Sequence, residues 1–361
     1  MKFLAFSLLV FPMHLFCCTG IYLKASDNSI VNGRTIEFGT SLDMSLAIIP
    51  RNYTFTQKST SVDPMNYKSV YAAAGVYCFD EPRLIDGINE MGLCIGAFYF
   101  SGFAKYAKIT QKNCKHALSP IDFSNWILTN FASIEQVKEA IKEVVISDDI
   151  LIPGAVLKDW KGGQPPLHYI VYDKFDNCIV IEPFGDSLKV YENKLGVITN
   201  SPSFDFHLTN LNNYVNLSPK NVETNKLGDY LLKSFSQGSG MLGLPGDFTS
   251  PSRFIRAAFF SAGALTPFNS SEAVDQTFHI LNQFDIPKGS ISQEIRGKIY
   301  YDFTMLTTVK DTKNLESFFK SYKNQATQLI KLDTFDFNSK TIKTMKIDGE
   351  QQKIDVSSKL Q

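Results

Sequence analysis

One short stretch, Cys17-Cys18-Thr19-Gly20-Ile21-Tyr22, divides this chain into two unlike parts. Residues 1–17 combine an early cation, Lys2, with an apolar run that few polar residues interrupt. This pattern is typical of an export signal, and it is too short and too interrupted for a membrane-spanning anchor. The chain from Cys18 onwards has the composition of a folded domain. We therefore expect an exported protein, periplasmic or secreted, whose mature chain begins at Cys18.

A chain that begins with cysteine carries a nucleophile and a base on one residue. The thiol is the nucleophile, and the free α-amine, with a reference pKa of about 7.7–8.0, is the base. The cleavage site departs from the small-x-small rule, because Leu15 and Cys17 precede the cut. Lipidation of Cys18 and an uncleaved start therefore stay open beside simple export, which we prefer.

Composition excludes several classes of function. The 361 residues are 44% hydrophobic and 20% charged, an ordinary globular composition with enough chain for one large domain. Lys plus Arg and Asp plus Glu both count 36, so no net charge favours a nucleic-acid or membrane-surface partner. No apolar run after the signal approaches the roughly 20 residues of a membrane span.

The cysteines predict neither a zinc site nor a disulfide framework. Apart from the adjacent pair they are scattered, without the C-x-x-C spacing of zinc ligands, and we expect no cofactor. Cys78, Cys94 and Cys178 lie in apolar runs, where a buried free thiol is the commoner state.

The order of predicted elements favours two antiparallel sheets with helices outside them. Strands, then helices, then strands again follow one another without the βαβ alternation of a parallel sheet. The strands are expected at 19–25, 30–37, 45–49, 69–79, 92–100, 167–172, 178–183, 188–191, 196–199, 304–309, 317–322 and 327–332, and the helices at 122–145, from 250 and from 271. Residues 205–245 are polar and loop-rich. We expect one domain over 18–348 and a polar tail over 349–361.

The first two strands form a hairpin that returns Arg34 and Glu37 towards Cys18. A cation beside a thiol favours the thiolate, which would suit a nucleophile. The residues alone favour a plainer interpretation, in which Arg34 and Glu37 form an ion pair on the surface of the hairpin.

Other chemistries find less support. A papain-like site needs a Cys–His pair, but no histidine of the mature chain lies in such a signature, and His168, on a predicted strand, is interpreted as structural. A glycosidase needs two carboxylates at a defined separation. The sequence has many carboxylates and gives no ground for choosing a pair. The residues alone support an N-terminal nucleophile hydrolase and an extracytoplasmic globular protein of unknown role about equally.

Five collinear segments decide between these two. They are Cys18-Thr19-Gly20, Gly33-Arg34, residues 86–93, residues 196–207 and residues 243–254. Together they resemble the choloylglycine hydrolase family, the conjugated bile salt hydrolases and penicillin V acylases within the N-terminal nucleophile hydrolases. The resemblance runs from Cys18 to about residue 345.

The resemblance implies an α+β fold, a four-layer αββα sandwich, and hydrolysis of a linear amide. It makes Cys18 the nucleophile and Arg34 the arginine beside its thiol. Asn200 matches the asparagine whose side chain helps to form the oxyanion hole, and Arg253 matches an arginine that supports the charge network.

Two further positions differ within the family or from it. Tyr99 falls where bile salt hydrolases usually carry Asn and penicillin V acylases carry Tyr, and its backbone N–H would be the second oxyanion donor. Glu37 stands where the family usually has Asp, so it keeps the charge on a side chain one methylene longer. The segment 210–229 resembles an extension that some members use to form tetramers, which implies a homotetramer.

The expected substrate is a small amide, most simply a conjugated bile salt or penicillin V. One alternative is another N-acyl compound, such as an acyl-homoserine lactone. The other is a lipid-tethered, non-catalytic envelope protein with the same fold.

Overall fold

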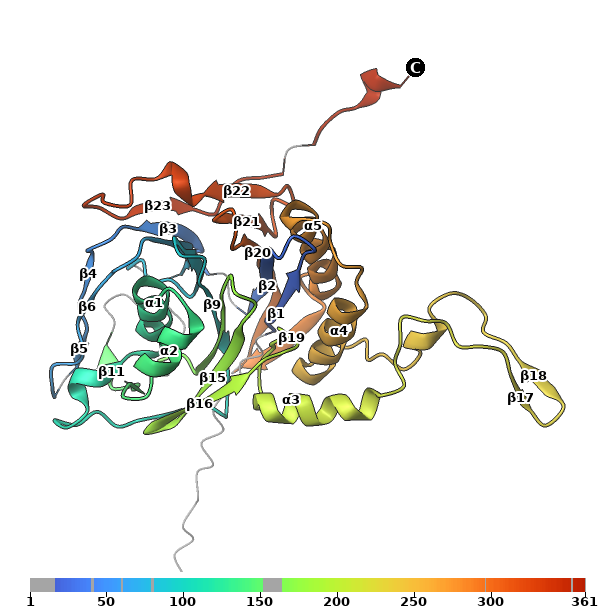
Figure 1. Cartoon of the computed structure of the whole chain (residues 1–361), viewed down its shortest axis with the longest axis horizontal. Coiled ribbons are helices and arrows are strands. Elements are labelled where there is room, and N and C mark those ends of the chain that lie inside the picture. The colour runs from blue at the N-terminus through green and yellow to red at the C-terminus, as the bar shows by residue number, and fades with distance from the viewer. Residues whose placement is uncertain are drawn as a thin grey trace, which may run out of the picture.

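The computed structural model of the chain describes residues 17–39, 42–59, 61–78, 81–151, 164–295, 297–351 and 353–360. Except for Cys17, the predicted signal lies outside these residues. Two sheets pack against each other and helices cover their outer faces, so the chain has the predicted αββα layers (Figure 1). Among the described residues, no helix combines the length and apolarity that crossing a bilayer requires.

The first sheet carries the start of the domain. In spatial order its strands are β1 (Thr19–Lys24), β2 (Ile30–Phe38), β20 (Lys298–Asp311), β21 (Glu316–Ser321) and β22 (Gln328–Lys331), with β19 (Ile291–Ile295) paired to β20. Strand β2 is thus held between β1 and the C-terminal strand β20, and is buried along nearly its whole length.

The second sheet is formed mostly from the middle of the chain. In spatial order its strands are β10 (Lys105–Tyr106), β15 (Cys178–Gly185), β14 (Leu167–Tyr172), β9 (Cys94–Tyr99), β8 (Asp86–Asn89), β7 (Ala73–Tyr77), β3 (Ser45–Ile49) and β23 (Lys343–Lys346), with β16 (Ser187–Glu192) paired to β15. Short pairs lie around it: β4 (Thr54–Phe55) with β6 (Tyr67–Lys68), β5 (Lys58–Ser59) with β13 (Ile150–Leu151), and β11 (Ala117–Leu118) with β12 (Val145–Ile146).

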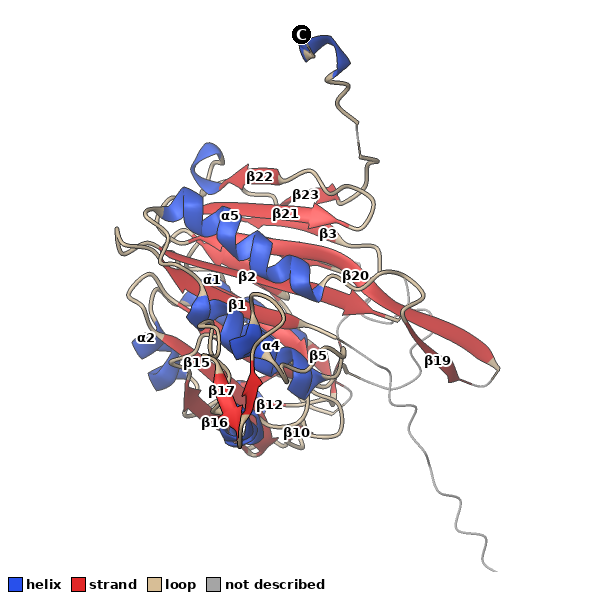
Figure 2. Cartoon of the chain, turned by 90° about the vertical axis from the view of Figure 1, so that its right-hand side faces the viewer, coloured by secondary structure: helices blue, strands red, loops and turns tan. Residues whose placement is uncertain are grey.

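Each sheet has its own pair of helices. Helices α4 (Ser250–Gly263) and α5 (Ser270–Leu281) contact the first sheet, and α5 crosses β2 and β20 (Figure 2). Helices α1 (Pro120–Asn130) and α2 (Ile134–Ala140) pack their buried faces on the second sheet. The remaining helix, α3 (Phe204–Leu211), leads into a projecting hairpin of β17 (Asn225–Leu227) and β18 (Tyr230–Leu232). Single 3₁₀ turns occur at Cys114–His116, Asn212–Tyr214, Ser239–Met241, Asn282–Phe284, Leu332–Thr334 and Ser357–Lys359.

The β1–β2 hairpin has the predicted position and a defined register. Gly20 lies opposite Arg34 and Thr19 opposite Thr35, which brings the residue before β1, Cys18, to the end of β2. Gly20 is required by packing, because a Cβ there would lie 2.8 Å from the Phe98 ring and 2.9 Å from Ile198. Real side-chain contacts do not come this close, so any larger residue would force the packed Phe98 and Ile198 side chains to shift.

Three predicted elements differ from the structure. The helix predicted over 122–145 is two helices, because Ser133 caps a new one by accepting a hydrogen bond from the Gln136 N–H. The strand predicted over 196–199 is a single bridge from Ile198 to Gly20, since Gly196 has a positive φ of 64° that interrupts an extended run. The segment 205–245, predicted as loop-rich, contains most of α3 and the β17–β18 hairpin.

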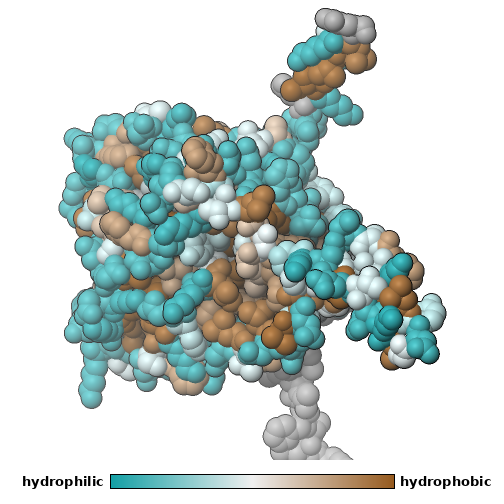
Figure 3. Space-filling view, turned by 45° about the vertical axis from the view of Figure 1, so that its right-hand side comes forward, coloured by the Kyte–Doolittle hydropathy of each residue, from teal (hydrophilic) through white to brown (hydrophobic). Residues whose placement is uncertain are grey.

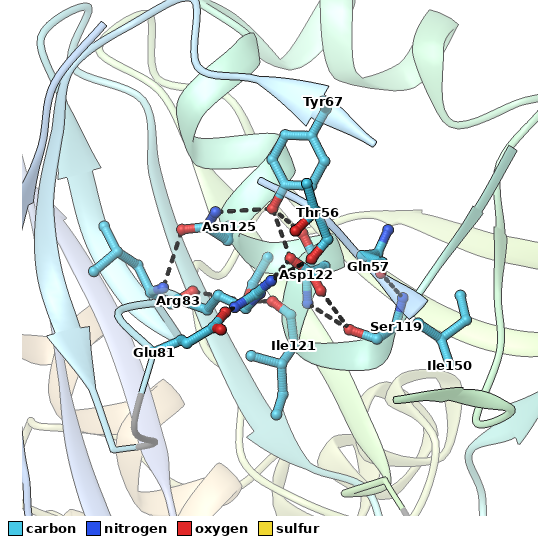
Figure 4. A network of polar contacts seen from close by, with 12 residues as sticks. Thr56, Gln57, Tyr67, Glu81, Arg83, Ser119, Ile121, Asp122, Asn125 and Ile150 are labelled. Carbon is cyan, nitrogen blue, oxygen red and sulfur yellow. Dashed lines mark hydrogen bonds and ion pairs between the residues drawn. The ribbon is translucent and has the colours of Figure 1, made fainter. Parts of the chain in front are cut away.

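A buried polar network fixes the start of α1 beneath the second sheet (Figure 4). The Asp122 carboxylate accepts hydrogen bonds from Arg83 Nε at 2.8 Å, the Tyr67 hydroxyl at 2.9 Å and Ser119 Oγ at 3.0 Å. Asn125 extends the network by donating to the same tyrosine hydroxyl at 2.8 Å. Every member therefore has a partner, which a buried charge pair needs if it is not to destabilise the fold.

We expect Asp122→Ala to lower the free energy of unfolding by about 3 kcal/mol. The substitution removes the buried one of the two carboxylates that pair with Arg83, the other being Glu81, and it leaves the Tyr67 and Ser119 hydroxyls without their acceptor. Urea unfolding followed by circular dichroism measures this. Glu139→Ala is the matched control, since Glu139 pairs with Lys142 on the exposed surface at the end of α2, where such a pair contributes about 0.5 kcal/mol at most. Equal losses in the two variants would contradict the prediction.

Candidate active site

Cys18 lies in an apolar pocket between the two sheets. The cavity has a volume of about 80 Å³, and among the described residues its wall carries Cys18, Arg34 and Glu37 beside mainly apolar side chains. Those include Ile36, Met44, Ile85, Ile121 and Leu167. The nucleophile predicted from the sequence therefore faces a space whose walls suit an apolar group.

Arg34 is buried beside Cys18, and the interpretation of a surface ion pair is wrong. The side chains of Arg34 and Glu37 belong to residues only 3% and 1% exposed. The Arg34 guanidinium lies over the Phe98 ring, 3.8 Å from its centroid, and donates from Nη1 to the Ala97 carbonyl at 2.6 Å. The ring and the carbonyl thus hold the cation against the pocket.

Glu37 reaches the same pocket although it is three residues from Arg34. Strict alternation along a strand would point the two side chains to opposite faces. The pairing of β2 with β20 shifts register between Ile36 and Glu37, and an irregularity of this kind re-aims side chains. Glu37 Oε1 accepts a hydrogen bond from Thr304 Oγ1 at 2.8 Å, and no described residue bonds Oε2.

The nitrogen of Cys18 belongs here to the Cys17–Cys18 peptide bond. Burial raises the pKa of the Glu37 carboxyl to about 8, although Arg253 and Arg34 oppose that shift. Burial also raises the pKa of the Cys18 thiol, again against the influence of Arg34. A thiol kept neutral in this way needs a nearby base before it can attack a substrate.

Asn200 connects Cys18 with Arg253. Its Oδ1 accepts the Cys18 backbone N–H at 2.7 Å and Arg253 Nη2 at 2.8 Å, and its Nδ2 donates to the Tyr99 carbonyl at 2.9 Å. Because an amide nitrogen carries two hydrogens, the second remains for another acceptor. The structure thus brings together all six residues predicted for the site.

Arg253 is enclosed and makes hydrogen bonds to several parts of the site. It lies on α4 and is 1% exposed. Besides Asn200, its guanidinium bonds the Cys18 carbonyl, Thr19 Oγ1 at 2.9 Å and the Phe248 carbonyl at 2.9 Å. One side chain thereby fixes the Cys18 carbonyl and the side chains of Thr19 and Asn200.

Several residues around the site were not predicted from the sequence. Thr304 holds Glu37, and Ser250 Oγ accepts the Asn200 N–H at 2.9 Å. His168 and His207 bond the carbonyls of Thr199 and Asn200 at 3.0 and 2.9 Å. His207 lies within the matched segment 196–207, which was the one signal that could have marked it. The described residues contain no group of His, Cys, Asp or Glu that could hold a metal ion.

The buried state of His207 predicts a pH effect on stability. Burial lowers the pKa of His207 to about 4, whereas an unfolded histidine titrates near 6.5. Between these values the unfolded state binds one proton more, so this histidine makes the fold less stable as the pH falls, by up to about 1.4 kcal/mol per pH unit. We expect His207→Gln to remove that slope between pH 6.5 and 4.

Urea unfolding midpoints measured from pH 7 to pH 4 check this effect. The exposed His279 offers the control, since His279→Gln should leave the slope of the parent chain unchanged. Parallel pH profiles for the parent chain and His207→Gln would contradict the assignment.

A cysteine at the start of a strand, beside a buried arginine and an amide side chain in an αββα sandwich, defines an amide hydrolase of the N-terminal nucleophile class. The family model for linear amide C–N hydrolases of the choloylglycine hydrolase family matches residues 18–345. This chain belongs to that family, and it is a linear amide hydrolase.

The relatives agree over nearly the whole chain. A bile salt hydrolase/transferase from Clostridium perfringens is 34% identical over 91% of this chain and 96% of its own. A solved structure of a mutant conjugated bile acid hydrolase from the same organism has a TM-score of 0.80 at 32% identity, covering 94% of this chain and 100% of that one. Penicillin V acylase from Agrobacterium tumefaciens, with a TM-score of 0.72 at 20% identity over 92% of each chain, shares the fold.

Proposed function

We propose that this hydrolase uses Cys18 as an N-terminal nucleophile and acts on an amide with a bulky apolar acyl group, in the first place a conjugated bile salt. One observation carries the proposal: Asn200 Oδ1 binds the Cys18 nitrogen and Arg253 together at the end of an apolar pocket. Removal of residues 1–17 would turn that nitrogen into a free amine beside its own thiol.

In the proposed reaction the Cys18 sulfur attacks the substrate carbonyl carbon while its proton passes to the α-amine. The tetrahedral oxyanion accepts hydrogen bonds from the second N–H of the Asn200 amide and, by resemblance, from the backbone N–H of Tyr99. The α-ammonium then protonates the leaving amine, and the C–N bond breaks to give a thioester on Cys18. Water, deprotonated by the same amine, attacks the thioester and releases the carboxylic acid and the free thiol.

The names of the relatives and the pocket both support bile salts. The relatives act, by their names, on bile salts and bile acid conjugates, and the aliphatic side chains of the pocket wall suit an apolar acyl group. Tyr99 favours penicillin V as the second candidate, because penicillin V acylases resemble this chain at that position. Acyl-homoserine lactones are a third candidate with the same mechanism.

One experiment separates these substrates. The purified mature protein is given cholyl-glycine, cholyl-taurine, penicillin V and an acyl-homoserine lactone, and the released amine or acid is measured. We expect the highest kcat/KM on a bile salt conjugate. A preference for penicillin V would move the assignment to the second candidate, and hydrolysis of none would overturn the proposed function.

Export and removal of the signal belong to the same proposal. We expect the intact mass of the exported protein to begin at Cys18 with a free amine. A lipid on Cys18 would instead shift the protein into the detergent phase on partitioning, and it would block both groups that the mechanism uses. That result would favour the non-catalytic envelope protein.

We also propose that the chain forms a homotetramer through its projecting arm, here residues 212–242. In Figure 1 the arm leaves the body beyond α3, and in Figure 3 it carries apolar side chains on its surface. Leu227 and Tyr230 are 73% and 72% exposed, and Leu231, Leu232 and Phe235 are exposed as well. Apolar side chains gathered on a thin arm indicate a surface that another chain covers.

Light scattering coupled to size-exclusion chromatography tests the assembly. We expect four chains for the parent protein, and smaller species for Tyr230→Asp with Leu232→Asp, because buried aspartates oppose association. Ile354→Asp, at an exposed site of the tail, is the control. A parent protein that elutes as a monomer would contradict the proposal.

A further inference from the structure

Three contacts fix the backbone of Asn200 in space. His168 Nε2 lies 3.0 Å from the Thr199 carbonyl, on one side of the Asn200 Cα. His207 Nε2 lies 2.9 Å from the Asn200 carbonyl, on the other side. Between them, the Asn200 N–H donates to Ser250 Oγ at 2.9 Å. Every polar backbone atom around the Asn200 Cα thus has a partner, and each partner comes from a different element.

These contacts determine which nitrogen of each imidazole ring donates a hydrogen bond. A carbonyl oxygen only accepts hydrogen bonds, so each Nε2 must carry the proton. The opposite nitrogens, Nδ1 of His168 and of His207, have no hydrogen-bond partner among the described residues. His168 Nδ1 does lie 3.6 Å from Oε1 of the buried Glu182, so both ring nitrogens of His168 face a polar group.

Both rings are themselves held rigidly. His168 and His207 are 1% exposed. His168 stacks on Phe100 with ring centroids 4.3 Å apart, and His207 stacks on Phe254 with centroids 4.7 Å apart. His168 lies on β14 and His207 on α3, so the two rings hold the Asn200 backbone at a fixed position relative to both elements.

We propose that His168, His207 and Ser250 form a clamp of positioning residues that sets the Asn200 side-chain amide against Cys18. The inference rests on the proposed function, because it assigns the clamp a role in stabilising the oxyanion. The Asn200 side chain has a fixed task on both atoms: its Oδ1 accepts from the Cys18 nitrogen and Arg253, and its Nδ2 donates to the Tyr99 carbonyl with one N–H left for the oxyanion. Oxyanion donors act only within a few tenths of an ångström of the right place.

His207→Phe isolates the hydrogen bond from the packing. Phenylalanine keeps an aromatic ring against Phe254 but cannot donate to the Asn200 carbonyl. We expect kcat to fall by about 10- to 100-fold with KM within about twofold of the parent enzyme, the effect of a reacting group displaced by up to an ångström. His207→Gln carries an N–H at similar reach, and should restore kcat to within about threefold.

Alkylation separates this role from a merely structural one. Iodoacetamide reacts with a thiolate by direct displacement at carbon and forms no oxyanion, so it reports the Cys18 thiol alone. Mass spectrometry of the N-terminal peptide gives its rate. We expect the alkylation rate in His207→Phe to match the parent enzyme while kcat falls. His279→Phe, the same substitution on the exposed face of α5, should change neither.

The outcomes are distinct. An unchanged kcat in His207→Phe, a parallel fall of kcat and alkylation rate, or no recovery in His207→Gln would each overturn the clamp. If His207→Phe does not fold, Ser250→Ala removes a second contact by deleting one oxygen, and the same split between kcat and alkylation is required. A parent enzyme that hydrolyses none of the amides refutes the proposed function instead, before any variant is compared.

Discussion

Cys18→Ala removes amide hydrolysis, with an expected loss of roughly 10⁴-fold or more, because no other group in the site can form the thioester. Cys18→Ser should retain only a trace of activity. A hydroxyl has the same position but loses its proton far less readily than a thiol, and burial already opposes the charged form of the Cys18 side chain. Release of glycine or taurine from the preferred conjugate is the measurement.

Two controls make this result specific. Cys114→Ala removes another buried thiol, which does not line the pocket, and should stay within about twofold of the parent activity. The intact mass of each variant must show a chain that begins at position 18, so that a failure to remove residues 1–17 is not mistaken for a loss of chemistry. Substantial hydrolysis by correctly processed Cys18→Ala would contradict the assignment of the nucleophile.

Local patterns were enough to predict the part of the fold that carries the nucleophile. The β1–β2 hairpin is predicted by two apolar runs around Asp27-Asn28-Ser29, and its register brings Arg34 to Cys18. Glu37 reaches the same pocket only through the register shift between β2 and β20, which no local pattern predicts. Ser133 and Gln136 also have the spacing of a capping box, but the helix predicted over 122–145 runs through them. In the structure Ser133 caps a second helix.

The rest of the fold and of the site could not be predicted, because it depends on pairing between segments that are far apart in the sequence. Nothing local in residues 298–311 indicates that this strand lies beside β2, some 270 residues earlier, and without that pairing Thr304 cannot be linked to Glu37. His168 was interpreted as structural, and it does bond a backbone carbonyl. The carbonyl that His168 bonds belongs to Thr199, the residue before Asn200. This contact depends on how two distant segments pack, and the spacing of residues in the sequence does not predict it.

Substitution of Asn200 should have the second largest effect on catalysis. The Asn200 amide offers one N–H that the Tyr99 carbonyl does not occupy, and it accepts from both Arg253 and the Cys18 nitrogen. We expect Asn200→Ala to lower kcat by about 10²–10³-fold, the usual loss for one oxyanion donor. Asn200→Asp should be no better, because a carboxylate keeps the acceptor but replaces the donor with a negative charge that repels the oxyanion.

The pattern across variants distinguishes an oxyanion donor from a residue that only orients Cys18. If Asn200 acts on the oxyanion, kcat falls while the rate of Cys18 alkylation by iodoacetamide stays close to that of the parent enzyme. If it merely holds the Cys18 nitrogen, Asn200→Asp, which keeps that acceptor, should recover most of the activity that Asn200→Ala loses. Asn213→Ala, at an exposed site beyond α3, gives the baseline for an asparagine outside the site. The loss in Asn200→Ala also sets the upper limit for the clamp, since His207→Phe can only misplace the amide that Asn200→Ala removes.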